Sequence, residues 1–218
     1  MRTPPNLQHR TLTHLTDHPA KTWLKRFLGA AALAASCGSL ADWQLDNAAS
    51  QLNFVSVKAT DIAEVHKFTE VSGTIRDGGK TTGEIDLSVE LASVDTLIPL
   101  RDSRMRELLF ETVTFPTAKL YGNLPLADFL TLGVGDSKTA DITLTLDLHG
   151  AKAPVTANVL VSRLSPSRML VTAKQPVVLQ AQTFSLVKGI EALREAAGLP
   201  SISKSIPVSF VFTFVDAA

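Results

Sequence analysis

Strict alternation of apolar and polar residues is the feature that most constrains how this chain can fold. Apolar residues occupy every second position in four segments: 85–91, 142–148, 155–161 and 206–214. Side chains of an extended chain point alternately to opposite faces, so each segment predicts a strand with one face on a core and one in water. Such half-buried strands are typical of antiparallel sheets.

Turn signals connect these strands into hairpins. Asp77-Gly78-Gly79 precedes the strand at 83–91, and His149-Gly150 separates 142–148 from 155–161. Glycine supplies the positive φ angles that tight hairpin turns need. The sequence predicts about eight strands in antiparallel order, without the regularly interposed helices of a doubly wound fold. We therefore expect an all-β sandwich or closed barrel, and closure would remove the exposed edges of so many apolar strands.

Two short helices interrupt the strands. Apolar residues at helical spacing predict one helix at 102–110, capped by Asp102 or Ser103, and another at 186–197. The segment 126–138 carries glycines and is expected to be a loop. The two helices are the elements that can cover an opening of the sheet.

The first 41 residues have the three parts of a secretory signal. Lys25-Arg26 is followed by a run of apolar and small residues at 27–36, and Ser39-Leu40-Ala41 provides a cleavage site. We therefore expect residues 1–41 to be removed and 42–218 to form one periplasmic domain. A buried helix or an uncleaved anchor are the alternatives for 27–36. Acylation at Cys37, the single cysteine, is the alternative to cleavage after Ala41.

Charge and motifs exclude several classes of function. Residues 42–218 hold 16 basic and 20 acidic side chains, which argues against nucleic acid as a partner. The chain has no G-x-S-x-G elbow, P-loop or dinucleotide fingerprint. His149 shares a strand face with Asp147, yet within residues 42–218 no histidine pair has metal-ligand spacing, so a hydrogen bond at the turn is favoured over a metal site. The sequence thus gives no reason to expect an enzyme or a cofactor.

Large apolar residues on the predicted inner faces have two interpretations. They could line a bore that holds a ligand, or they could fill the core themselves, since a small barrel has room for either. A bore is the hypothesis we develop, and Phe115 is a further candidate for its wall. The ten residues proposed to line it are Phe54, Phe68, Leu87, Leu109, Phe110, Leu146, Met169, Phe184, Phe210 and Phe212.

Several motifs resemble those of the YceI family, in order and spacing. Val94-Asp95-Thr96 leads to Arg101-Asp102-Ser103-Arg104-Met105-Arg106-Glu107-Leu108-Leu109-Phe110 and then to Phe115-Pro116-Thr117-Ala118. Leu144-Thr145-Leu146-Asp147-Leu148-His149-Gly150 with Pro154-Val155 is similar to the family's L-T-x-H-G hairpin. The likeness runs from about Asp42 to Phe214. It departs from the common pattern in the lid helix and at Gln182–Ser185.

The resemblance implies a lipocalin-like antiparallel barrel that holds a long isoprenoid or related lipid, with a quinone as one candidate. It also implies a membrane b-type cytochrome as a partner. Apart from the resemblance, a homodimer is one expected oligomeric state. Arg101 and Arg104 are expected at the rim, where they could meet a polar head group. The alternatives are a packed barrel that serves as a structural or interaction domain, and an enzyme with Asp147 and His149 inside the bore.

Overall fold

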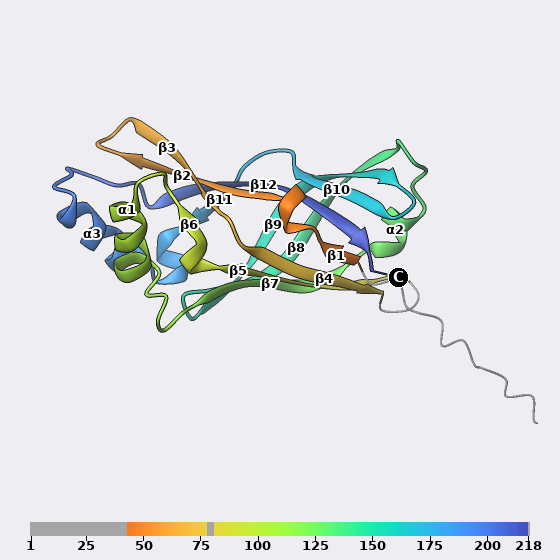
Figure 1. Ribbon diagram of the computed structural model, residues 1–218, viewed down its shortest axis with the longest axis horizontal. Helices are drawn as coiled ribbons and strands as arrows, with labels where there is room; N and C mark the ends of the chain where they lie inside the picture. The colour runs from red at the N-terminus through yellow and green to blue at the C-terminus, as the bar shows by residue number, and fades with distance from the viewer. Residues whose placement is uncertain (1–42, 78–80, 218) are drawn as a thin grey trace, which may run out of the picture. The chain divides into compact units, whose positions relative to one another are not determined.

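A computed structural model describes residues 43–77 and 81–217 (Figure 1). The predicted signal segment, Cys37 and the glycines of the first predicted turn lie outside the described residues. The strands are β1 (Trp43–Leu45), β2 (Gln51–Lys58), β3 (Ile62–Phe68), β4 (Val71–Asp77), β5 (Gly83–Glu90), β6 (Val94–Asp95), β7 (Thr117–Leu124), β8 (Ser137–Leu148), β9 (Ala151–Ser165), β10 (Arg168–Ala173), β11 (Val177–Gln180) and β12 (Ser205–Asp216).

Short helices connect these strands. The α-helices are α1 (Pro99–Arg104), α2 (Leu126–Leu130) and α3 (Val187–Ala196). A π-helical turn, η3 (Met105–Leu109), continues α1, and 3₁₀ turns form η1 (Asn47–Ala49), η2 (Leu91–Ser93) and η4 (Ala181–Phe184). None of the helices in the described ranges is long and apolar enough to cross a membrane.

Eight of the strands close into an antiparallel barrel. Their order is β1-β4-β5-β7-β8-β9-β10-β12, and β12 pairs with β1 to complete the ring. At the closure, Trp43 lies between Asp216 of β12 and Ile75 of β4. The predicted all-β barrel is therefore confirmed, and both expected hairpins, β4–β5 and β8–β9, are present.

The strand β12 changes partners along its length. Its C-terminal part pairs with β1 and β10, whereas its N-terminal part pairs with β2 and β11. Beyond β2 the sheet continues into β3 and β6 instead of closing. No ladder joins β9 to β11 within the described ranges. The barrel is thus closed by hydrogen bonds at one end and splayed at the other.

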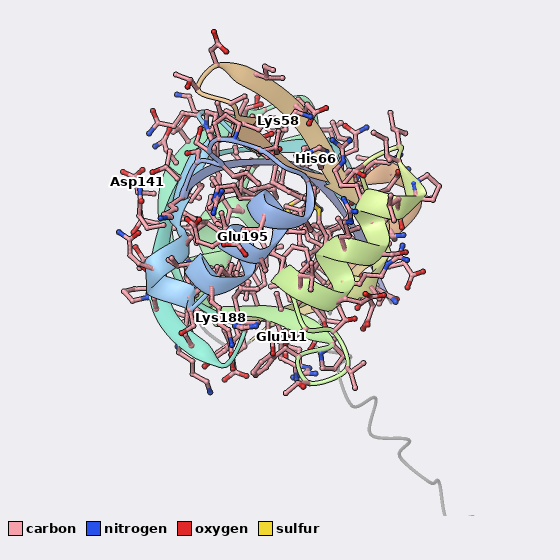
Figure 2. The ribbon with its side chains drawn as sticks, turned by 90° about the vertical axis from the view of Figure 1, so that its left-hand side faces the viewer. Lys58, His66, Glu111, Asp141, Lys188 and Glu195 are labelled. Carbon is pink, nitrogen blue, oxygen red and sulfur yellow. The ribbon has the colours of Figure 1, made fainter. Side chains whose placement is uncertain are left out.

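Helices cover both ends of the barrel. Figure 2 looks onto the splayed end, where α1 and α3 lie across the opening. The helix α2 lies at the opposite end (Figure 1), with Leu126 and Phe129 buried in the core. The prediction of two short helices was therefore incomplete, because the expected loop at 126–138 contains α2. The apolar side chains of α2 are buried by packing against the end of the barrel. The local sequence, with its nearby glycines, does not show this packing.

The expected cap of the lid helix was wrong. The helix begins at Pro99, whose fixed φ suits the first helical position, and Asp102 lies inside α1. The carboxylate of Asp102 instead accepts hydrogen bonds from the backbone N–H and the hydroxyl of Thr96. This contact ties the helix to the chain that enters it.

Close backbone contact joins the two elements that cover the splayed end. A Cβ atom at Gly189 of α3 would lie 2.5 Å from the carbonyl oxygen of Leu108 and 2.7 Å from the Cα atom of Leu109. Only glycine allows this approach. It brings Ile190 and Leu193 of α3 into the same buried cluster as Leu109.

We predict that Gly189→Ala destabilises the fold by about 1–3 kcal/mol, because the added methyl group must push α3 away from η3. Helix propensity alone acts in the opposite direction, since alanine is favoured over glycine by about 1 kcal/mol. Denaturant unfolding measures the change. Ala196→Gly, at the exposed end of the same helix, reports the propensity effect by itself. A gain in stability for Gly189→Ala would show that α3 does not lie against η3.

Candidate functional site

The barrel encloses an apolar cavity of about 270 Å³. Inward-facing side chains of β2–β5 and β7–β12 form its wall. Leu109 and Ile190 close it beneath the helices of the splayed end, while Leu126 and Phe129 of α2 close the other end. Asn53 and Gln180 are the exceptions in a lining that is otherwise apolar. A hydrocarbon is the kind of molecule that such a wall can hold.

The structure places all ten sequence-predicted bore residues against this cavity: Phe54, Phe68, Leu87, Leu109, Phe110, Leu146, Met169, Phe184, Phe210 and Phe212. Their contact with a ligand stays a prediction. Aromatic rings form two groups along the wall. The centroid of Phe68 lies 5.4 Å from that of Phe54 and 5.7 Å from that of Phe110. Phe210 and Phe212 stack with centroids 4.7 Å apart.

Phe115 is not part of the wall. Its ring lies against His149, with centroids 4.3 Å apart, at the turn between β8 and β9. The strand face expected for His149 was also wrong, because a positive φ of 52° takes this residue into the turn. Its ring nitrogens are buried and have no hydrogen-bond partner in the described ranges, so the expected turn hydrogen bond is not formed. The Nε2 atom lies 3.8 Å from a carboxylate oxygen of Glu111.

A catalytic cluster inside the bore would need Asp147 and His149 there, and neither lines the cavity. The carboxylate of Asp147 lies 3.4 Å from the ammonium of Lys152. No group of histidine, cysteine, aspartate or glutamate in the described part of the chain has the arrangement of a metal site.

A second, smaller cavity of about 200 Å³ lies at the splayed end between β2, α1 and α3. It shares Phe54, Leu109, Ile190 and Ile206 with the bore. Its apolar floor meets a charged edge that consists of Lys58, Glu64, Arg101 and Arg104. The two arginines predicted at the rim therefore lie beside this cavity and not in the bore itself.

The two arginines differ in how they are held. Arg101 donates to the Glu64 carboxylate at 2.7 Å and to the Thr96 carbonyl oxygen at 2.7 Å. Lys58 lies 2.8 Å from the same carboxylate. The hydrogen bond from Lys58, with further help from Arg101, keeps the pKa of Glu64 below 4.5 despite partial burial. Arg104 has no ion pair or hydrogen bond of its side chain among the described residues.

A buried polar layer separates this charged edge from the apolar bore. His66, Thr96 and Asp102 are buried side chains of this layer. The Nε2 atom of His66 lies 2.8 Å from the Ser56 hydroxyl oxygen, and its ring lies 5.2 Å from that of Phe54. Its Nδ1 atom has no partner in the part of the chain that the structure describes. Burial, reinforced by Arg101, lowers the pKa of His66 below 6.5.

Sequence reasoning missed this layer. Ser56 and His66 are ten residues apart and meet only because β2 and β3 pair with Phe54 opposite His66. Alternation within 51–58 indicates a strand, but the sequence does not show which side chain will form a hydrogen bond with the buried histidine.

A groove of about 360 Å³ runs along the side of the barrel where β9 and β11 are not hydrogen-bonded. It lies between residues 153–158 and 175–180. Val155, Leu179 and Phe184 line both this groove and the bore. One layer of side chains therefore separates the two at this place.

Comparison with known proteins decides the family. The YceI-like domain profile matches residues 43–214. The chain belongs to the YceI family. No match was found among curated proteins. The resemblance noted in the sequence is thus confirmed over nearly all of the described residues.

Two solved structures share this barrel. A polyisoprenoid-binding domain from Saccharophagus degradans, implicated in plant cell wall breakdown, is 40% identical and superposes with a TM-score of 0.76, covering 80% of this chain and 98% of the other. BcnA from Burkholderia cenocepacia is 16% identical with a TM-score of 0.59, covering 78% and 98% of the two chains. The latter likeness shows the fold alone. Membership of this family points to a binding protein rather than an enzyme.

We predict that His66 makes folding sensitive to mild acid. Its pKa in the folded protein lies below 6.5, so as the pH falls through 6.5 protons bind preferentially to the unfolded chain and the free energy of unfolding decreases. For one group the slope is at most about 1.4 kcal/mol per pH unit. Denaturant unfolding between about pH 7.5 and 5.5 measures it.

The matched variant is His66→Gln, which keeps a polar group near Ser56 but does not titrate in this range. Its stability should change less with pH than that of the wild type. Equal slopes for the two proteins would show that His66 is not held neutral by burial.

Proposed function

We propose that the protein is a secreted carrier that holds a long isoprenoid or a related lipid in the bore of its barrel, with a quinone as one candidate. The observation that carries the proposal is the cavity of about 270 Å³ with its almost wholly apolar wall. The polyisoprenoid-binding domain from Saccharophagus degradans, which is 40% identical to this chain, supports the same ligand class.

The physical driving force would be burial of hydrocarbon. At about 25 cal/mol per Å² of apolar surface, each isoprene unit taken from water adds on the order of 1–3 kcal/mol before ordering costs. A well-packed interior leaves few voids larger than a water molecule, and an apolar void of about 150 Å³ already binds benzene. The larger bore found here argues against the alternative of a barrel filled by its own side chains.

A polar head group would lie in the smaller cavity at the splayed end. Arg101 and Arg104 border that cavity, which shares Phe54 and Leu109 with the bore. Arg101 is already held by Glu64 and by the Thr96 carbonyl, so Arg104 is the cation with free donors for such a group. Their roles at the head group stay a prediction.

Secretion into the periplasm is part of the proposal and rests on the signal pattern of residues 1–41. A membrane b-type cytochrome as partner follows from the family resemblance alone, and a homodimer is proposed as one oligomeric state. Intact mass of the protein purified after expression of the full chain distinguishes cleavage after Ala41 from acylation at Cys37. Fractionation of the expressing cells reports the compartment.

We predict that the protein, expressed as the full chain and purified without detergent, carries a stoichiometric polyprenyl or quinone species. Extraction with organic solvent followed by mass spectrometry, compared with a mock purification, identifies it and its chain length. A folded protein that comes without such a species, and that also rejects added polyprenyl alcohol, would contradict the carrier function.

A charge placed in the wall should abolish retention of the lipid. Phe210 faces the bore, and Val211, the next residue of β12, is exposed. We predict that Phe210→Glu loses the extracted species, because a carboxylate without a partner is costly in an apolar site. Val211→Glu should retain it. Circular dichroism checks that both variants fold, and a folded Phe210→Glu protein with full lipid content would remove Phe210 from the site.

A further inference from the structure

Exposed large apolar side chains gather beside the opening of the smaller cavity. Five of them come from β3 and from the segment between β6 and α1, and we call them the mouth patch: Ile62, Val65, Leu97, Ile98 and Leu100. Leu97 is 83% exposed and Val65 is 68% exposed. Contiguous exposed apolar residues rimmed by polar ones mark sites of interaction with proteins or membranes.

Strand pairing brings the two segments of the patch together. In the β3–β6 ladder Lys67 lies opposite Asp95, and the chain leaves this ladder at Asp95, two residues before Leu97. The ion pair of Arg101 with Glu64 then holds α1, which carries Leu100, against the same strand. The patch is therefore a surface formed by two segments and not an isolated side chain.

The exposure of Leu97 is built into the backbone. Its φ of 62° lies in the left-handed region, which is unfavourable for a leucine. The carboxylate of Asp95 accepts a hydrogen bond from the backbone N–H of Leu97 at 2.9 Å and thereby fixes this turn. The fold thus holds a large apolar residue outward at an energetic cost.

The patch is continuous with the proposed lipid path. Ile98 and Leu100 line the smaller cavity, which in turn shares Phe54 and Leu109 with the bore. A molecule that covered the mouth patch would therefore also cover the opening of this cavity.

Charge around the patch favours an anionic surface. Asp95 is paired with Lys67, and Glu64 is shared between Lys58 and Arg101. Arg104 is left without a carboxylate partner among the described residues. Arg104 thus keeps its donors free for an anion such as a lipid phosphate, while the carboxylates of Glu64, Asp95 and Asp102 are held by protein partners.

We propose that the mouth patch docks the protein on the surface of a bilayer that contains anionic phospholipid. Leu97, Ile98 and Leu100 enter the boundary between head groups and acyl chains, and Arg104 meets lipid phosphate. The opening of the smaller cavity then faces the membrane, so that a lipid passes between bilayer and bore without crossing water. This inference rests on the proposed carrier function and adds the surface through which the cargo is exchanged.

Cosedimentation with vesicles of equal parts phosphatidylglycerol and phosphatidylcholine tests the docking. We expect the double variant Val65→Ser/Leu97→Ser to bind at least about tenfold more weakly than the wild type. Neither residue lines a cavity, and both are exposed, so the fold and the lipid capacity should be preserved. The matched control is Leu164→Ser/Val178→Ser, which removes exposed apolar residues elsewhere and should leave vesicle binding unchanged.

Electrostatics and transfer provide two further readouts. Arg104→Gln should weaken binding to these vesicles about fivefold and have a smaller effect with phosphatidylcholine alone. A polyprenyl alcohol supplied in the vesicles should load into Val65→Ser/Leu97→Ser about tenfold more slowly than into the wild type, while loading from detergent micelles is equal. If the double variant does not fold, Leu97→Ser alone replaces it.

Docking and carriage fail in different ways. The docking surface is overturned if the wild-type protein does not bind the vesicles. It is also overturned if the mouth-patch variant binds them as well as the wild type does. Protein that binds vesicles through the patch but never captures the polyprenyl alcohol overturns the carrier function and leaves the docking intact. Equal losses of vesicle binding in the two double variants would also overturn the proposal, because they would show that any exposed apolar residue contributes to binding.

Discussion

The rest of this structure depends on the strand β12 and on the hydrogen bonds that hold it in place. This strand has hydrogen-bonded neighbours on both sides, although those neighbours change from β1 and β10 to β2 and β11 along its course. Thr213 holds the point of change: its hydroxyl donates to the Ala49 carbonyl oxygen at 3.0 Å, and its backbone N–H donates to the Ser50 hydroxyl at 3.0 Å. The chain leaves the sheet at η1, and these hydrogen bonds replace the ladder that is interrupted there. This break lets one sheet be a closed barrel at one end and a splayed mouth at the other.

Polarity changes in steps from that barrel to the mouth. The bore is apolar, the layer with His66 and Asp102 is polar and buried, and the edge with Glu64 and Arg101 is charged. The inner face of β2 and β3 spans all three, since Phe54, Ser56 and Lys58 follow one another at alternate positions. One hairpin thus matches the order of groups in an amphiphile, with its hydrocarbon inward and its polar end toward solvent.

The barrel and its wall could be predicted from the sequence because both depend on a period of two. Alternation placed Leu87, Leu146 and Phe212 on inner faces, and hairpin order restricted the topology. Features that depend on contacts between distant segments could not be predicted from the sequence. The helix α2 is stable only against the barrel end it covers, and the partner of His66 is set by register. The position of Phe115 was missed for the same reason, since His149 reaches it through a positive φ that sequence alternation does not report.

The missing ladder between β9 and β11 has a mechanical meaning. Around the ring of eight strands the circumference is fixed by rows of backbone hydrogen bonds, and stretching it would break several at once. The gap between β9 and β11 lies outside this ring, at the splayed end. At this seam the wall is held by side chains such as Val155, Leu179 and Phe184, which can change rotamer one at a time. The splayed end can therefore widen here at lower energy than at a laddered pair of strands. In the proposed lipid carrier, this seam is where cargo of a different girth would be accommodated.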